Sequence, residues 1–196
     1  SAGTPYPEAR VVLSHEPPSA ALRVSSPDGP PWLWTRTNPG HPTVVPLPRG
    51  REAFDITATA FGHAASQATG VVPDKTKRVA IDVPSSGQLS LHITDAATGA
   101  PIPGRVRVVP ISPPTKFSLG PDYRADGAED AAYTLSGELS LTLPLGKHRI
   151  LVSHGPDWTW ADQTVVITGD EPTSVDAKLT HLSRPGGCAA CDFHLH

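Results

Sequence analysis

The fold of this chain is most constrained by its short apolar runs, in which apolar and polar residues alternate. Such runs occupy residues 22–24, 54–58, 78–83 and 139–143. Clusters of proline, glycine and asparagine separate them, for example Asn-Pro-Gly at residues 38–40. Alternation with a period of two is typical of strands that have one buried face. No window carries the apolar stripe and capping residues of a helix. The pattern therefore predicts an all-β fold with little or no helix.

A turn-like sequence near the middle of the chain indicates a boundary between two modules. Residues 84–87 read Pro-Ser-Ser-Gly, and the series of short strands and turns starts again after them. The two halves also look like copies, because Leu-Pro-Arg-Gly at 47–50 matches Leu-Pro-Leu-Gly at 143–146. Proline at the second position and glycine at the fourth suit a type I turn. Residues 22–24 and 91–93 form a second match. We therefore expect two tandem small β-sandwiches.

These matches set the expected bounds of the parts. The expected parts are an extended lead-in or edge strand at 1–20, a first sandwich at 21–84, a second sandwich at 86–180, and a linker with the start of a further strand at 181–196. Two stretches are expected to be loops: the alanine-rich residues 60–68, and an irregular insert at 112–137 in the second module.

Composition excludes several classes of function. The net charge of −3 provides no basic surface for nucleic acid. No apolar run approaches the ~18 residues of a membrane span. No signal peptide is visible at Ser1, which fits a processed mature terminus or a cytoplasmic protein. The all-β character, rich in proline, threonine and serine, favours an extracellular or cell-envelope location.

The last nine residues contain the strongest candidate for a chemical site. Cys188 and Cys191 are followed by Asp-Phe-His-Leu-His, which ends in His194 and His196. In a strand, residues two apart share a face, so the two imidazoles would point together and could ligate one divalent metal ion such as Zn, Mn or Fe. A catalytic metal needs three or more protein ligands. We therefore expect no catalysis from this chain alone.

Other interpretations of this tail stay open. The two cysteines and two histidines can form a small site for Zn or Cu, although their spacing is tighter than in usual Cys₂His₂ sites. The cysteines can instead form a disulfide in an oxidising compartment. The histidine pair can also belong to a disordered tail or a tag remnant. The other histidines are scattered, and we expect them on the surface or on strand faces and not as ligands.

Two Trp-x-Trp pairs are the candidates for a binding surface. They are Trp32 with Trp34, and Trp158 with Trp160. On a strand, each pair would place both rings on one face. Such a face can bind a sugar or another protein chain. Packing at the end of a sandwich or between domains is the interpretation that we favour for these rings.

The second module resembles a known family. Residues 89–109 begin L-x-L-x-I-x-D-A-x-T-G-x-P-I-P-G-R-V, which resembles the first hairpin of carboxypeptidase-regulatory-like (transthyretin-like) sandwiches. The resemblance covers residues 86–180 well and 20–84 weakly. It implies two transthyretin-like or immunoglobulin-like sandwiches, and it says little about function because such modules are mostly attached domains.

The tail resembles a second family. Asp-Phe-His-Leu-His is similar to the first metal-binding motif of PHP-type metal-dependent hydrolases, in which β-sandwich modules precede the catalytic barrel. The resemblance implies that His194 and His196 are metal ligands and that Asp192 is a supporting residue. The chain would then be the non-catalytic N-terminal region of a metallohydrolase. It would position or oligomerise the rest of the parent polypeptide.

A different class of function remains as the alternative. The chain can be a complete extracellular module for structure, adhesion or assembly, with partners among other subunits, copies of itself or glycans. In that case the terminal cysteines and histidines would form only a small metal site or a disulfide.

Overall fold

The chain folds into strands only, within the part that the structure describes. The structure is a computed structural model, and it describes residues 6–14, 20–27, 29–38, 40–50, 52–73, 75–120 and 127–182. The prediction of an all-β fold without helix is confirmed for these residues. They contain no helix long and apolar enough to cross a membrane.

The first half of the chain forms a three-stranded and a four-stranded sheet. The orders are β4-β1-β7 and β3-β2-β5-β6. The side chains between the sheets form one hydrophobic cluster drawn from residues 9–83. The strands are β1 (Glu8–Ser14), β2 (Ala21–Ser25), β3 (Pro31–Arg36), β4 (Thr43–Pro46), β5 (Phe54–Thr59), β6 (Ser66–Val71) and β7 (Arg78–Asp82).

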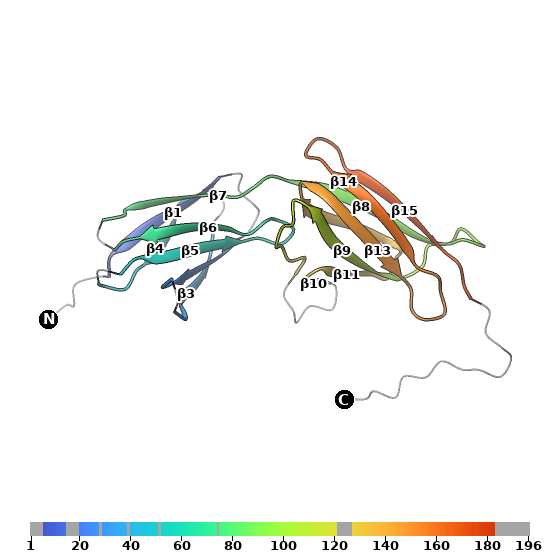
Figure 1. Cartoon of the computed structure of the whole chain (residues 1–196), viewed down its shortest axis with the longest axis horizontal. Helices are drawn as coiled ribbons and strands as arrows, with labels where there is room; N and C mark the ends of the chain where they lie inside the picture. The colour runs from blue at the N-terminus through green and yellow to red at the C-terminus, as the bar shows by residue number, and fades with distance from the viewer. Residues whose placement is uncertain are drawn as a thin grey trace, which may run out of the picture.

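The second half forms a three-stranded and a five-stranded sheet. The orders are β12-β8-β15 and β10-β11-β9-β13-β14. A separate hydrophobic cluster, drawn from residues 89–179, fills the space between them. The strands are β8 (Ser86–Asp95), β9 (Gly104–Ser112), β10 (Gly127–Ala128), β11 (Ala131–Thr134), β12 (Glu138–Pro144), β13 (Gly146–Ser153), β14 (Ala161–Ile167) and β15 (Thr173–Leu179). We call the two halves the first and second modules; Figure 1 shows them one after the other along the long axis.

Alternation along the strands builds each cluster. In β7 the side chains of Val79 and Ile81 are buried and their neighbours are exposed. In β8 Leu89, Leu91 and Ile93 are buried and their neighbours are exposed or half-buried. Each large apolar side chain taken out of water contributes about 1.5–3 kcal/mol. Residues 83–85 connect the last strand of the first half, β7, to the first strand of the second half, β8.

The pairing order shows that the two modules are copies. In each module the first strand pairs antiparallel with one strand and parallel with the last: β1 with β4 and β7, and β8 with β12 and β15. In the facing sheets, the order β3-β2-β5-β6 repeats as β11-β9-β13-β14. The match of residues 47–50 with 143–146 is consistent with this equivalence, because each stretch joins equivalent strands.

Two expectations from the sequence need correction. Strand β1, expected as a lead-in or edge strand, is the middle strand of its sheet, and Ala9, Val11 and Leu13 are buried in the first cluster. The match of residues 22–24 with 91–93 was wrong, because β2 is equivalent to β9 and β8 is equivalent to β1. The parallel partner of β1 lies far along the chain, so no local pattern marks it as a middle strand.

The predicted turn at 143–146 does not close a hairpin within one sheet. Strand β12 ends at Pro144 and β13 begins at Gly146, and these strands belong to different sheets. The chain therefore bends from one sheet to the other. Gly146 has φ 126°, and a Cβ there would lie 2.4 Å from the carbonyl oxygen of Ser112. Glycine is required for this close approach.

The predicted loops contain strands at their ends. Strand β6 begins at Ser66, within the expected loop 60–68, and β10 and β11 lie within the expected loop 112–137. All three are short, and β6 alternates polar and small residues, so they carry little of the apolar pattern by which strands are recognised.

Candidate functional site

The predicted metal residues lie outside the described part of the chain. Cys188, Cys191, His194 and His196 all fall within residues 183–196. Their role in binding metal therefore stays a prediction. Among the described residues, no group of three or more histidine, cysteine, aspartate or glutamate side chains is arranged to hold a metal ion.

The first tryptophan pair lies on an exposed face. Trp32 and Trp34 are on β3, an edge strand, and their side chains are 50% and 62% exposed. The register with β2 is irregular at Trp32, whereas Trp34 lies opposite Arg23. The ring centroid of Tyr6 lies 6.3 Å from that of Trp32, and the guanidinium of Arg23 lies 5.9 Å from the ring centroid of Trp34.

The second pair is divided between two environments. Trp158 packs against the second hydrophobic cluster, and its ring lies between those of His154 and His181 at centroid distances of 5.0 and 5.1 Å. Trp160 is 64% exposed. The two residues follow β13 and precede β14, so they do not lie together on a regular strand. Trp158 therefore has the packing role that we favoured, and Trp160 is free to contact a ligand.

One of the scattered histidines is a core residue. His148 points inward from β13, its Nε2 atom donates to the carbonyl oxygen of Pro144 at 2.8 Å, and its ring meets that of Phe117 edge to face. Its Nδ1 atom is buried without a partner among the described residues.

The structural feature with the clearest functional meaning is the junction between the modules. The turn between β5 and β6 reaches the second module, where the backbone N–H of Gly62 donates to the carbonyl oxygen of Ser118 at 2.8 Å. The backbone N–H of Ala65 donates to the carbonyl oxygen of Lys116 at 3.3 Å. We call this contact of residues 62–65 with residues 116–118 the junction. The sequence predicted loops for both stretches but gave no sign that they touch.

Gly62 allows the two modules to approach closely. Its φ is +74°, and a Cβ atom there would lie 2.1 Å from the carbonyl oxygen of Thr142 in the second module. No other residue fits without displacing that backbone. An isolated glycine can mark a close backbone approach, but the sequence indicates only a loop here and does not identify the partner.

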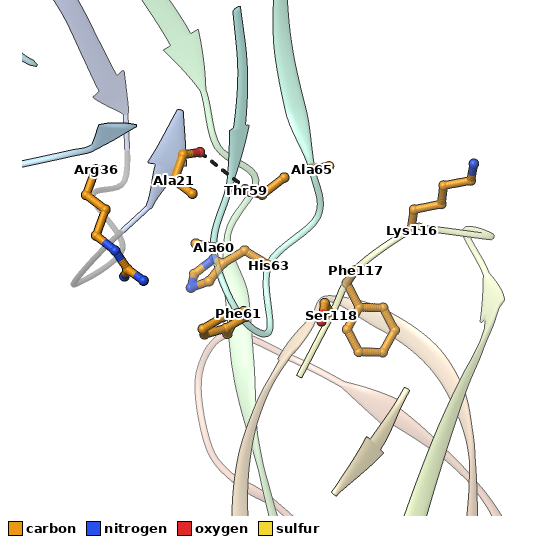
Figure 2. Close-up of a pocket in the computed structure, with 10 residues that line it drawn as sticks. All are labelled: Ala21, Arg36, Thr59, Ala60, Phe61, His63, Ala65, Lys116, Phe117 and Ser118. Atoms are coloured by element: carbon orange, nitrogen blue, oxygen red, sulfur yellow. Dashed lines mark hydrogen bonds between the residues drawn. The ribbon is translucent and has the colours of Figure 1, made fainter. Parts of the chain in front are cut away.

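A small cleft lies beside the junction and is shown in Figure 2. Its volume is about 310 Å³, and Phe61 and His63 of the first module and Phe117 and Ser118 of the second lie on its two sides. The Nε2 atom of His63 lies 3.5 Å from the hydroxyl of Ser86, where β8 begins. The lining residues include no carboxylate. The cleft lies where the two modules meet.

Two carboxyl groups at the surface have pKa values below the usual value. Asp95 accepts from the backbone N–H of Ala97 at 2.9 Å and from the hydroxyl of Thr98 at 2.8 Å, and these bonds hold the pKa of its carboxyl below the usual value. The guanidinium of Arg149 donates to both carboxylate oxygens of Asp162, which lowers the pKa of Asp162 and raises that of Arg149. Both are structural: Asp95 fixes the turn after β8, and the ion pair joins β13 to β14.

Comparisons with known proteins find only distant structural likeness. No protein-family model matches the chain, and no curated protein matches it in sequence. A streptococcal ancillary pilin is similar over 93% of this chain at 15% identity with a TM-score of 0.39, and the chain spans 64% of that protein. The Bacillus anthracis TIE protein is similar over 88% of the chain at 13% identity and a TM-score of 0.37, and the chain spans 33% of it.

The shaft pilin SpaA from Lactobacillus rhamnosus GG is a further structure of this kind. The likeness covers 85% of this chain and 89% of that protein, at 13% identity and a TM-score of 0.40. Likeness at this level assigns no function to the chain. No PHP-type hydrolase is among these structures, so the hydrolase resemblance of the tail gains no support from them.

Proposed function

We propose that this chain is a structural or assembly module: a rigid two-sandwich spacer that holds the parts attached to it at a fixed separation. The single observation that carries the proposal is the hydrogen bond from the backbone N–H of Gly62 to the carbonyl oxygen of Ser118. A connector of residues 83–85 alone would leave two separate cores free to rotate, because small interfaces between domains permit relative motion by default.

The partners in the junction are anchored in both cores. On the first side, Ala60, just before the turn, is buried in the first cluster. On the second side, Phe117 and Leu119 pack against the second cluster, and the backbone N–H of Leu119 donates to the carbonyl oxygen of Glu129 at 2.6 Å. Each hydrogen bond across the junction therefore joins one packed core to the other and does not join two free loops.

The proposal fits a module that associates with other subunits. Each described sheet ends in edge strands, among them β4, β3, β12 and β10, whereas β14 and β15 are linked by the side chains of Gln163 and Thr173. Such edges carry backbone groups that can pair with another chain. An extracellular or cell-envelope location, favoured by composition, is part of the proposal. The association with a metallohydrolase rests on the tail sequence and is a separate proposal.

Two glycine variants test the proposal. Gly62→Ala places a methyl group against the backbone of Thr142, whereas Gly70→Ala introduces similar backbone strain, at φ +70°, where nothing lies within 4 Å. Small-angle scattering should give a larger or more variable maximum dimension for Gly62→Ala than for the wild type, and an unchanged one for Gly70→Ala. Circular dichroism checks that both fold. Equal scattering from all three folded proteins would reject the junction as the rigid element.

A further inference from the structure

The two modules carry the same cross-strand pair of an arginine and an aromatic residue. In the first module Arg23 on β2 lies opposite Trp34 on β3, and in the second Arg105 on β9 lies opposite Tyr133 on β11. The guanidinium carbon lies 5.9 Å from the ring centroid in both pairs. Because β2 and β3 are equivalent to β9 and β11 in the pairing order, the pairs occupy equivalent places.

In each module, a residue with a hydroxyl group lies on the other side of the arginine. The register partner of Arg23 on its other side is Thr57 of β5, and that of Arg105 is Ser153 of β13, the equivalent strand. The rows are therefore Trp34, Arg23, Thr57 in the first module and Tyr133, Arg105, Ser153 in the second. We call them the first and second rows.

Both rows lie on the outer faces of their sheets. The side chains of Val24 and Val106, next to the two arginines along the chain, point into the cores and are fully buried. Trp34 is 62% exposed and Tyr133 is 44% exposed. Neither row contributes to a hydrophobic cluster. Packing therefore does not explain why the same arrangement occurs twice.

The arginines of the two rows differ from their neighbours in their ionic contacts. Within the described residues, Arg23 and Arg105 form no ion pair, whereas the neighbouring Arg107 is bonded to Asp130 and Arg149 is bonded to Asp162. Among the described residues Arg78 also forms no ion pair, so it is the aromatic neighbour that distinguishes Arg23 and Arg105. An arginine held beside an aromatic ring is preorganised to bind a carboxylate through two N–H groups.

A further exposed tryptophan accompanies each row. Trp32 lies two residues before Trp34 on β3, and Trp160 lines a hollow of about 150 Å³ together with Arg105 and Ser153. The flat ring of a tryptophan packs well against the apolar C–H face of a sugar ring. Each row thus combines stacking surface, a carboxylate-binding cation and a hydroxyl for hydrogen bonding.

We propose that the two rows are equivalent subsites for an acidic polysaccharide whose sugars carry carboxylates. A polymer with regularly spaced carboxylates can bind both rows at once. Binding at one row then raises the effective concentration of the polysaccharide at the other. Strands β3 and β11 both lie toward the lower side of the molecule in Figure 1. The inference is independent of the spacer function. It retains Trp32, Trp34 and Trp160 as ligand-binding residues and leaves out Trp158, which is packed.

Retention of the whole chain by polysaccharide tests the proposal. The probes are polygalacturonate and alginate, with fully methyl-esterified polygalacturonate as the matched polymer that lacks free carboxylates. In affinity electrophoresis, at least one acidic probe should retard the wild type strongly and the ester should not. Arg23→Gln and Arg105→Gln should each weaken the apparent affinity about tenfold or more, because each removes one of two linked contacts. The double variant should lose retention.

Arg78→Gln is the control for nonspecific charge. Arg78 is an exposed arginine on β7, in the opposite sheet of the first module. The Arg78→Gln variant should bind the acidic polysaccharide as the wild type does. Equal weakening by Arg78→Gln, equal retention by the ester, or no retention by either acidic probe would overturn the proposal. So would sedimentation showing that Arg23→Gln and Arg105→Gln instead dissociate a dimer of this chain.

Discussion

The backbone N–H of Gly62 and the carbonyl oxygen of Ser118 are joined by a 2.8 Å hydrogen bond, although each belongs to a module with its own hydrophobic core. The bond exists because a glycine at φ +74° lets the turn between β5 and β6 approach the backbone of Thr142. We propose that this contact holds two sandwiches on a short connector as one rigid body.

The bend from β12 to β13 should not tolerate a side chain. Gly146→Ala places a Cβ 2.4 Å from the carbonyl oxygen of Ser112 at φ 126°, whereas Gly99→Ala, at φ +73°, meets nothing within 4 Å. Gly99→Ala has the cost of a left-handed backbone conformation, about 1–2 kcal/mol. Gly146→Ala has a φ that residues other than glycine rarely adopt and adds a steric clash. Urea unfolding should show a distinctly larger loss of unfolding free energy for Gly146→Ala. Equal losses would contradict the close approach.

The two cores should respond separately to truncation. Leu22 and Leu91 are both fully buried, one in each cluster. Leu→Ala at either position should cost about 2–5 kcal/mol. Hydrogen exchange should place the increased opening in the first module for Leu22→Ala and in the second for Leu91→Ala. An increase spread evenly over both modules in each variant would contradict separate cores.

The turn after β8 should make stability depend on pH. The bonds from Ala97 and Thr98 lower the pKa of Asp95 below its value of 3.8 in the unfolded chain. Its stabilising contribution is therefore fully present above the unfolded pKa and is lost as the pH falls through the lower, folded pKa. Asp95→Asn keeps the side-chain acceptor and removes the charge. The difference in unfolding free energy between wild type and variant should shrink from about pH 6 to about pH 2. A difference that stays constant with pH would exclude the charge as its source.

The tail should bind a divalent metal through its histidines if the sequence interpretation is right. Zinc titration of the whole chain should show a site that the double variant His194→Ala/His196→Ala weakens more than about tenfold, since ligands set metal affinity. Cys188→Ser/Cys191→Ser separates the alternatives: it should leave a histidine site intact and should abolish a four-ligand site. His92→Ala, a change to an exposed histidine on β8, is the control. Unchanged zinc affinity in the histidine variant would exclude both kinds of site.

The sequence predicts the strands best where one face is fully buried. The alternation at 89–93 and the Asp-x-x-Thr-Gly turn after it predict both the buried face of β8 and the turn that Asp95 fixes. The edge strand β3 has mostly exposed residues, and β10 has only two residues. Their alternation of apolar and polar residues is therefore weak. The central place of β1 depends on pairing with β7, which local periodicity does not encode.

The same limit applies to the candidate sites. The tryptophans at 32 and 34 are visible as a pair in the sequence, whereas the irregular register at Trp32 is not. Their arginine partner sits on another strand, and the repeat of the row in the second module uses a tyrosine in place of a tryptophan. The junction joins residues 62 and 118, which no motif connects. Contacts of this kind follow from the register between strands and from tertiary packing.

The distance between the two modules in solution tests the central claim most directly. Spin labels at Thr69→Cys on β6 and Thr164→Cys on β14, both exposed sites, in a Cys188→Ser/Cys191→Ser background, report this distance by pulsed electron resonance. The rigid junction predicts one narrow distance distribution, which Gly62→Ala broadens and Gly70→Ala leaves unchanged. A broad distribution in the otherwise unmodified chain would contradict the account, because it would mean that the modules turn freely about residues 83–85.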